Sequence, residues 1–171
     1  MKKISTTALA VSGMLAALVM VTTMFTKLPV PMTQGYIHLG DALILFSAML
    51  VGPLAVPIGG IGSALADLLG GYGLYVLPTL CIKAWAGFVA SRGLRLSGKR
   101  ALARCAMAFV SAELTMVLGY FVMELSFFNS AVALSSVPMN LVQALSSAAL
   151  GCALLPVAQR IAPRLRGSRP L

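Results

Sequence analysis

The sequence predicts an all-α membrane protein with six transmembrane helices, both termini in the cytoplasm and a ligand pocket that opens outward. Of its 171 residues, 59% are apolar and only 10% are charged, whereas a soluble domain carries about 25% charged residues. The apolar residues form runs close to the length of a bilayer span, about 20 residues. Short basic clusters separate these runs. We therefore expect residues 1–171 to form a single integral membrane domain.

Each run predicts one helix, and the breaks between runs follow from proline, glycine or charge. The loop 27–37 contains Pro29 and Pro31, which cannot both lie inside a helix. Gly52-Pro53 divides one long apolar stretch into two short helices. A basic segment and the segment 127–136 (FFNSAVALSS) separate the remaining three helices. The predicted spans are 5–26, 38–53, 55–71, 76–93, 104–126 and 137–159.

The basic residues set the orientation. The net charge is +9, but the charges lie between apolar runs as topology signals, which argues against nucleic-acid binding. With the N-terminus inside and six passages, eleven of the thirteen Lys and Arg residues fall on the cytoplasmic side. If 38–71 were one passage, the loop 92–104 with its five basic residues would face outward. That arrangement would oppose the positive-inside bias.

Polar side chains within the predicted spans lie between the outer surface and the midplane. Such groups are costly in lipid, so each one is a candidate functional residue. Asn140 and Gln143 share a face of one helix, and Glu113 and Tyr120 share a face of another. The sequence therefore predicts an outward pocket for a small molecule. The proposed substrate-binding residues are Tyr36, His38, Asp41, Asp67, Lys83, Glu113, Tyr120, Asn140 and Gln143.

Structural roles are also consistent with several of these residues. The open alternatives are a buried ion pair between Asp67 and Lys83, a helix cap by His38 and Asp41, a water-exposed helix end at Glu124, and interfacial positions for Tyr72 and Tyr75. Glu113 is the hardest to explain by packing, because an unpaired carboxylate near the midplane is very costly.

No motif supports catalysis, a metal or a cofactor. The segment from Gly93 to Arg100 nearly matches a phosphate-binding loop, but Arg100 replaces the hydroxyl residue that would hold Mg²⁺. The chain therefore has no ATP site of its own and no predicted catalytic residues. A membrane enzyme or sensor with an outward pocket is the alternative, but no nucleophile–base set supports it. A channel or ion carrier is disfavoured by the apolar inner halves of the helices.

The first helix carries a stripe of small residues. Ala8, Ser12 and Ala16 follow one another at four-residue steps, a spacing that lets helix backbones approach closely in lipid. The stripe predicts either packing within the bundle or a docking surface for another subunit.

Residues 29–72 carry a specific resemblance. The runs YIHLGD at Tyr36–Asp41 and GGIGSALADLLGGY at Gly59–Tyr72 resemble the substrate-binding S components of energy-coupling factor (ECF) vitamin transporters. The likeness is greatest to the branch with predicted hydroxymethylpyrimidine and pyridoxine carriers, and it extends over nearly the whole chain.

The resemblance implies a non-enzymatic subunit in a cell membrane of bacterial type. Such a subunit binds a small water-soluble vitamin or precursor, with the loop between helices 1 and 2 as a lid. It works with a transmembrane T subunit and two ATPase subunits. The stripe at Ala8, Ser12 and Ala16 would contact the T subunit.

Overall fold

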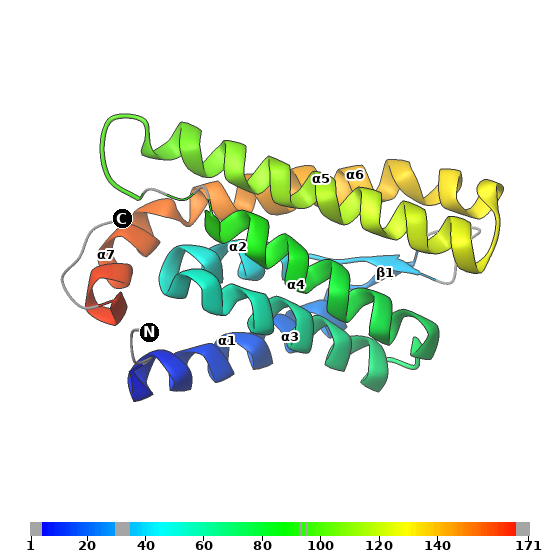
Figure 1. Cartoon of the computed structure of the whole chain (residues 1–171), viewed down its shortest axis with the longest axis horizontal. Coiled ribbons are helices and arrows are strands. Elements are labelled where there is room, and N and C mark those ends of the chain that lie inside the picture. Colours follow the sequence, from blue (N-terminus) through cyan, green and yellow to red (C-terminus); the bar gives the residue numbers. More distant parts are fainter. Residues whose placement is uncertain (1–4, 30–34, 93, 95, 167–171) are drawn as a thin grey trace.

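The structure is a computed structural model that describes residues 5–29, 35–92, 94 and 96–166. Its long helices lie side by side along one axis, with two short strands between them (Figure 1). In chain order the elements are α1 (Thr6–Phe25), β1 (Leu28–Pro29), β2 (Tyr36–Ile37), α2 (Gly40–Val51), the 3-10 turn η1 (Gly52–Leu54), α3 (Ala55–Leu69), the 3-10 turn η2 (Gly73–Tyr75), α4 (Val76–Arg92), α5 (Ala101–Phe127), α6 (Ser130–Ala153) and α7 (Leu155–Arg166).

Within the described residues, four helical stretches are long and apolar enough to cross a membrane. They are Thr6–Phe25, Gly40–Leu69, Gly73–Arg92 and Ala101–Phe127. The bent pair Ser130–Ala153 and Leu155–Leu165 makes a fifth if it is counted as one span. The chain is therefore an all-α membrane protein that crosses the bilayer several times.

The stretch Gly40–Leu69 is a hairpin and not a straight rod. Its two helices, α2 and α3, meet at η1, where Gly52 has a φ of 61° and a ψ of −126°. A side chain added at Gly59 of α3 would meet Ile44 of α2 at 2.9 Å, although a straight helix would separate these residues by about 22 Å. The chain therefore reverses direction at Gly52, as Figure 1 shows.

Helix α3 packs closely against its neighbours through glycines. A Cβ atom at Gly62 would lie 2.6 Å from the carbonyl oxygen of Ala16 in α1, and one at Gly60 would lie 2.9 Å from that of Leu80 in α4. Small residues allow this approach of backbones where the hydrophobic effect does not drive helices together. The row of small residues in α3 thus serves bundle packing.

Helices α1 to α5 begin and end within three residues of the predicted spans, but the last span, 137–159, is wrong. Helix α6 already begins at Ser130 because the side chain of Asn129 accepts a hydrogen bond from the Val132 N–H at 3.0 Å and caps it. Pro138 lies inside α6. The expected loop 127–136 is therefore mostly helical, and a 64° bend separates α6 from α7.

The two ends of the bundle differ in charge. Helix α1 begins and α7 ends at one end, which we call the basic end (Figure 1). The described basic residues near this end are Arg92, Lys99, Arg100, Arg104, Arg160 and Arg164. The opposite end carries η2 and the α5–α6 connection, and strands β1 and β2 pair there in an antiparallel ladder with Tyr36 opposite Pro29. We call this the pocket end, for the cavity described next.

Candidate functional site

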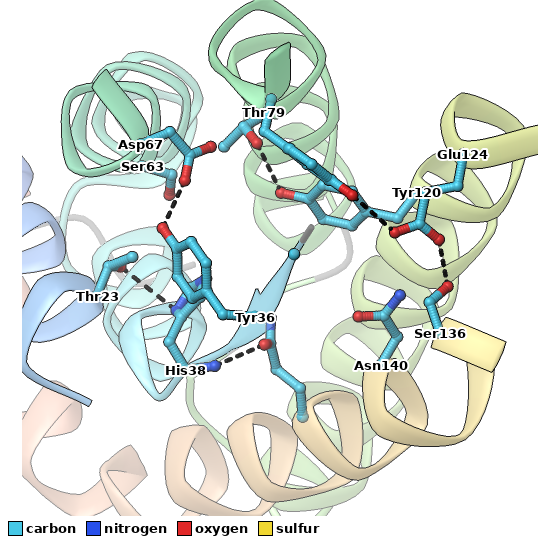
Figure 2. A pocket seen from close by; sticks show the side chains of 13 residues that line it. Thr23, Tyr36, His38, Ser63, Asp67, Thr79, Tyr120, Glu124, Ser136 and Asn140 are labelled. Atoms are coloured by element: carbon cyan, nitrogen blue, oxygen red, sulfur yellow. Dashed lines mark hydrogen bonds between the residues drawn. The ribbon is translucent and has the colours of Figure 1, made fainter. Parts of the chain in front are cut away.

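A cavity opens among α1, α3, α4, α5, α6 and strand β2 at the pocket end (Figure 2). The space among its lining atoms, including solvent at its opening, is about 460 Å³. Gly35 is the only one of the thirteen lining residues without a polar side-chain group, and three of the others are tyrosines, whose rings add apolar surface. The lining residues are Thr23, Gly35, Tyr36, His38, Ser63, Asp67, Tyr75, Thr79, Tyr120, Glu124, Ser136, Asn140 and Gln143.

Tyr36 stands at the mouth of the cavity. Its hydroxyl donates to Asp67 Oδ1 at 2.5 Å, which ties strand β2 to the end of α3. Burial, followed by the negative charge of Asp67, raises the pKa of Tyr36, so the phenol keeps its proton and stays a donor. The ammonium of Lys27 lies 4.5 Å from the Tyr36 ring centroid and 4.6 Å from that of Tyr72. A cation and two aromatic rings therefore hold this side of the mouth together.

The wall formed by α4, α5 and α6 carries a second set of hydrogen bonds. Thr79 and Tyr120 pair through their hydroxyls at 2.9 Å. Tyr75 donates to Glu124 Oε1 at 3.2 Å, and Ser136 donates to the other oxygen of the same carboxylate. Only 3% of Glu124 is exposed. The expected water-exposed helix end at Glu124 is therefore wrong, because α6 begins early enough for Ser136 to cover it.

His38 and Gln143 form the floor of the cavity. Gln143 accepts a hydrogen bond from the His38 backbone N–H at 2.7 Å and donates to Asp41 Oδ2 at 2.5 Å. His38 Nδ1 accepts from the Gly40 N–H at 3.0 Å, so a neutral ring carries its proton on Nε2. His38 precedes α2, and burial lowers its pKa to about 4. The imidazole is therefore uncharged near neutral pH.

A buried ion pair lies next to this floor. The ammonium of Lys83 is fully buried and lies 2.8 and 2.7 Å from the two carboxylate oxygens of Asp41. The expected alternative, an ion pair between Asp67 and Lys83, is thus wrong, because Lys83 pairs with Asp41. Asp67 instead accepts a hydrogen bond from Tyr36. Asp41 also accepts a hydrogen bond from Gln143, so the pair positions a residue that lines the cavity. Asp41 and Lys83 themselves lie outside the lining.

Glu113 also lies outside the lining, farther along α5. Helices α5 and α6 pack so that Glu124 meets Ser136, and a side chain at Gly151 would meet Phe109. The same register places Glu113 opposite Ser147. Glu113 Oε2 and Ser147 Oγ are both buried and make no hydrogen bond within the described part of the chain.

Two lining groups are left free for a ligand. The Ser63 hydroxyl is buried and has no partner among the described residues. Asn140 is 7% exposed, its amide makes no hydrogen bond to any residue that the structure describes, and it points into the cavity (Figure 2). Buried polar groups are nearly always hydrogen-bonded in native proteins. The cavity is therefore built to be completed by a polar molecule.

The structure brings six of the nine predicted binding residues together in the cavity: Tyr36, His38, Asp67, Tyr120, Asn140 and Gln143. It places Asp41, Lys83 and Glu113 outside the lining. The residues that the sequence did not assign to the site are Thr23, Gly35, Ser63, Tyr75, Thr79, Glu124 and Ser136. The spacing of Ser63 and Asp67 on one helix face was a usable signal, whereas Ser136 lay in an expected loop.

The small-residue stripe of α1 faces the bundle. Ser12 is buried, and the carbonyl of Ala16 lies against Gly62 of α3. The exposed side of α1 carries Gly13, around which no heavy atom would lie within 4 Å of an added Cβ. The stripe at Ala8, Ser12 and Ala16 therefore packs at least partly within this chain.

Comparisons with known proteins agree with this architecture. Residues 3–160 match the family described as "ECF-type riboflavin transporter, S component". A protein of Pyrococcus woesei, described as "Uncharacterized protein in gap 3'region", is 37% identical over 134 residues, which cover 78% of this chain and 88% of that protein. The expected ECF S-component family is thereby confirmed, and its hydroxymethylpyrimidine and pyridoxine branch stays a prediction. This chain belongs to the family of ECF-type riboflavin transporter S components.

Proposed function

We propose that this chain is the substrate-binding subunit of an ATP-driven ECF importer, and that its cavity binds one small water-soluble vitamin or precursor. The observation that carries the proposal is a cavity lined by polar residues, whose Asn140 amide and Ser63 hydroxyl lack partners among the described residues. The other contacts proposed for the ligand are Tyr36, His38, Asp67, Tyr120 and Gln143. Binding needs no nucleotide, because energy enters through separate ATPase subunits.

The polar lining favours a small heterocycle with many polar atoms, such as pyridoxine or hydroxymethylpyrimidine. Riboflavin, which appears in the family description, has a dimethylbenzene edge that needs apolar contacts. The lining has no Leu, Ile, Val or Met, and its apolar surface comes mainly from the rings of Tyr36, Tyr75 and Tyr120. Burying polar groups against an apolar edge without replacing their hydrogen bonds is unfavourable. We therefore propose a single-ring substrate.

Asp41, Lys83 and Glu113 are proposed to support the site from below. Asp41 orients Gln143 through its amide, and Lys83 neutralises Asp41. Glu113 lies within electrostatic range of this pair. These residues would act on affinity by holding Gln143 and the start of α2 in place, without touching the ligand.

We further propose six passages with both termini in the cytoplasm, so that the cavity opens outward. Counting α2 and α3 as separate passages supports this number, since the chain reverses at Gly52. Apart from Lys27 and Lys83, the described basic residues gather at the end where α1 begins and α7 ends (Figure 1), which the positive-inside rule places in the cytoplasm. Membrane location in a bacterial-type cell is part of the same proposal.

The partner module would be a transmembrane T subunit with two ATPase subunits. Helix α1 is the proposed contact with the T subunit. Because Ser12 and Ala16 pack toward α3, we assign the contact to the opposite side of α1, which exposes Ala10, Gly13 and Ala17. Small residues there would again permit a close helix approach.

Calorimetry on the purified chain in detergent, without ATP, tests the binding proposal. The panel is pyridoxine, hydroxymethylpyrimidine, thiamine and riboflavin. We expect tight 1:1 binding of a single-ring compound and no binding of riboflavin. Failure of every compound to bind, with the fold confirmed by circular dichroism, would refute the proposed function. Tight binding of riboflavin alone would refute the single-ring assignment.

A further inference from the structure

The charges around the cavity are unbalanced. Among its thirteen lining residues, Asp67 and Glu124 carry carboxylates and none is Lys or Arg. His38, the remaining ionisable side chain besides the tyrosines, is held in its uncharged form by burial. The lining itself therefore carries negative charge and no cation, although the ammonium of Lys27 lies over the Tyr36 ring at the mouth.

The nearest cations are already engaged. Both oxygens of Asp41 hold the ammonium of Lys83. Lys27 lies over the rings of Tyr36 and Tyr72 and interacts with Asp67 from outside the lining. Lys83 is therefore not free to neutralise a negative group inside the cavity, and Lys27 acts from the mouth, where it already faces two rings and Asp67.

Glu124 is the carboxylate that lacks a cation. It is 3% exposed and has two hydroxyl donors, Tyr75 and Ser136, one on each oxygen. No basic side chain acts on it within the described residues. Each carboxylate oxygen has a second lone pair, so both can accept one further hydrogen bond. A buried carboxylate without a counter-charge is unfavourable unless a ligand supplies one.

We infer that this pocket selects its ligand by charge. It takes a nitrogen heterocycle with an amino group or a protonated ring nitrogen, which donates to Glu124, and it rejects the phosphate ester or carboxylate of the same ring. Asn140 and Ser63, both buried and without partners among the described residues, supply the uncharged contacts that hold the rest of the molecule. The inference rests on the proposed function and assigns its substrate class.

An anionic ligand finds no compensating cation among the lining residues. Its charge would lie beside two buried carboxylates, and low-dielectric surroundings strengthen that repulsion. Arg or Lys is the usual partner of phosphate in proteins, and the lining has neither. Discrimination therefore comes from the site itself and needs no separate filter.

The test compares matched ligands that differ only in charge. The probes are pyridoxamine, pyridoxine, pyridoxine 5′-phosphate and 4-pyridoxic acid, together with hydroxymethylpyrimidine, thiamine and riboflavin, each beside its monophosphate. Affinities are measured by calorimetry on the whole purified chain in detergent. For any ring that binds, we expect the uncharged or cationic form to bind at least 100-fold more tightly than its anionic form. In the pyridine series we expect pyridoxamine to bind most tightly.

Glu124→Gln should lower the ratio of the affinity for the amine or cationic form to the affinity for the anionic form at least tenfold, while the chain stays folded. The control Asn129→Asp adds a charge at the same end of the bundle, on an exposed residue that caps α6 and lies outside the lining. It should leave the ratio unchanged, since Asp is also a good N-cap. Asp67→Asn provides a second carboxylate variant if Glu124→Gln does not fold.

The outcomes separate the two claims. If an anionic form binds within threefold of its uncharged partner, charge selection is wrong and the proposed binding function stands. An unchanged ratio in folded Glu124→Gln also overturns the inference. If no probe binds to folded protein, both the proposed function and this inference fail.

Discussion

At the scale of single residues, Lys83 is a charged side chain that is fully buried in the described structure. Its hydrocarbon chain lies inside the helix bundle, and its ammonium contacts Asp41. The same ammonium lies 5.2 Å from the Tyr120 ring centroid. Removing one member of a buried ion pair leaves an uncompensated charge, which costs about 3–5 kcal/mol. With both side chains buried, each one therefore depends on the other for its counter-charge.

We predict that Lys83→Met lowers the free energy of unfolding by about 3–5 kcal/mol, because Asp41 is left buried without a cation. The double variant Lys83→Met/Asp41→Asn should recover much of this loss, since no charge remains to be buried. Unfolding in detergent with increasing denaturant measures both. A single variant as stable as the parent would show that the pair does not hold the floor of the cavity.

His38 predicts a pH dependence. Its pKa in the fold is about 4 because of burial, against about 6.5 in an unfolded chain. Below pH 6.5 the unfolded state binds a proton that the folded state does not, so stability falls as the pH drops from about 6.5 to about 4. The loss from this residue approaches about 3 kcal/mol.

The control for this prediction is His38→Asn. An Asn side chain can also accept the N–H two residues ahead, as His38 Nδ1 accepts from Gly40, but it does not titrate. Thermal unfolding from pH 7 to pH 4 should show a smaller loss in His38→Asn than in the parent. Equal losses in the two proteins would rule out His38 as the source.

At the scale of the elements, glycines in α3 decide how closely the helices approach. A Cβ at Gly62 would lie 2.6 Å from the Ala16 carbonyl oxygen and 3.0 Å from Val19 Cβ, whereas one at Gly13 of α1 would have no neighbour within 4 Å. The two glycines differ in surroundings and share a helical backbone. They are therefore a matched pair for testing the α1–α3 contact.

We predict that Gly62→Ala lowers the free energy of unfolding by about 1–3 kcal/mol, because α1 must move away from α3. Gly13→Ala should be neutral or stabilising by up to about 1 kcal/mol, since Ala favours helix over Gly. Denaturant unfolding of both variants measures the difference. If both substitutions stabilise the protein to the same extent, the close α1–α3 contact is wrong.

Most elements were predictable from the sequence because each is an apolar run between charged or Pro/Gly-containing segments. The start of α6 was not, since 127–136 was expected to be a loop, whereas the Asn129 cap sets the start of the helix within that segment. The pairing of Lys83 with Asp41 was also out of reach. It depends on α2 lying beside α4, and hydropathy does not say which helices are neighbours.

At the scale of the whole molecule, the bundle separates two tasks. The apolar core, with Leu45, Met49, Cys105 and Phe109, is continuous between the helices, while the polar side chains line a cavity at the other end from the described basic residues. Six of the nine residues predicted to bind substrate line this cavity, because polar groups in lipid are rare. Thr23 was missed because a lone hydroxyl in a span carries little signal, and Ser136 because it lay in the expected loop 127–136.

Native mass spectrometry of the chain purified without ATP tests the central claim, that this cavity holds a small-molecule substrate. We predict one bound organic molecule per chain in the parent and in Asn129→Ser, whose exposed residue keeps a capping side chain. Asn140→Leu, which removes the unpaired amide from the cavity, should lose the bound mass while staying folded. Retention of the same molecule by Asn140→Leu, or no bound molecule in the parent after incubation with the vitamin panel, would contradict the account.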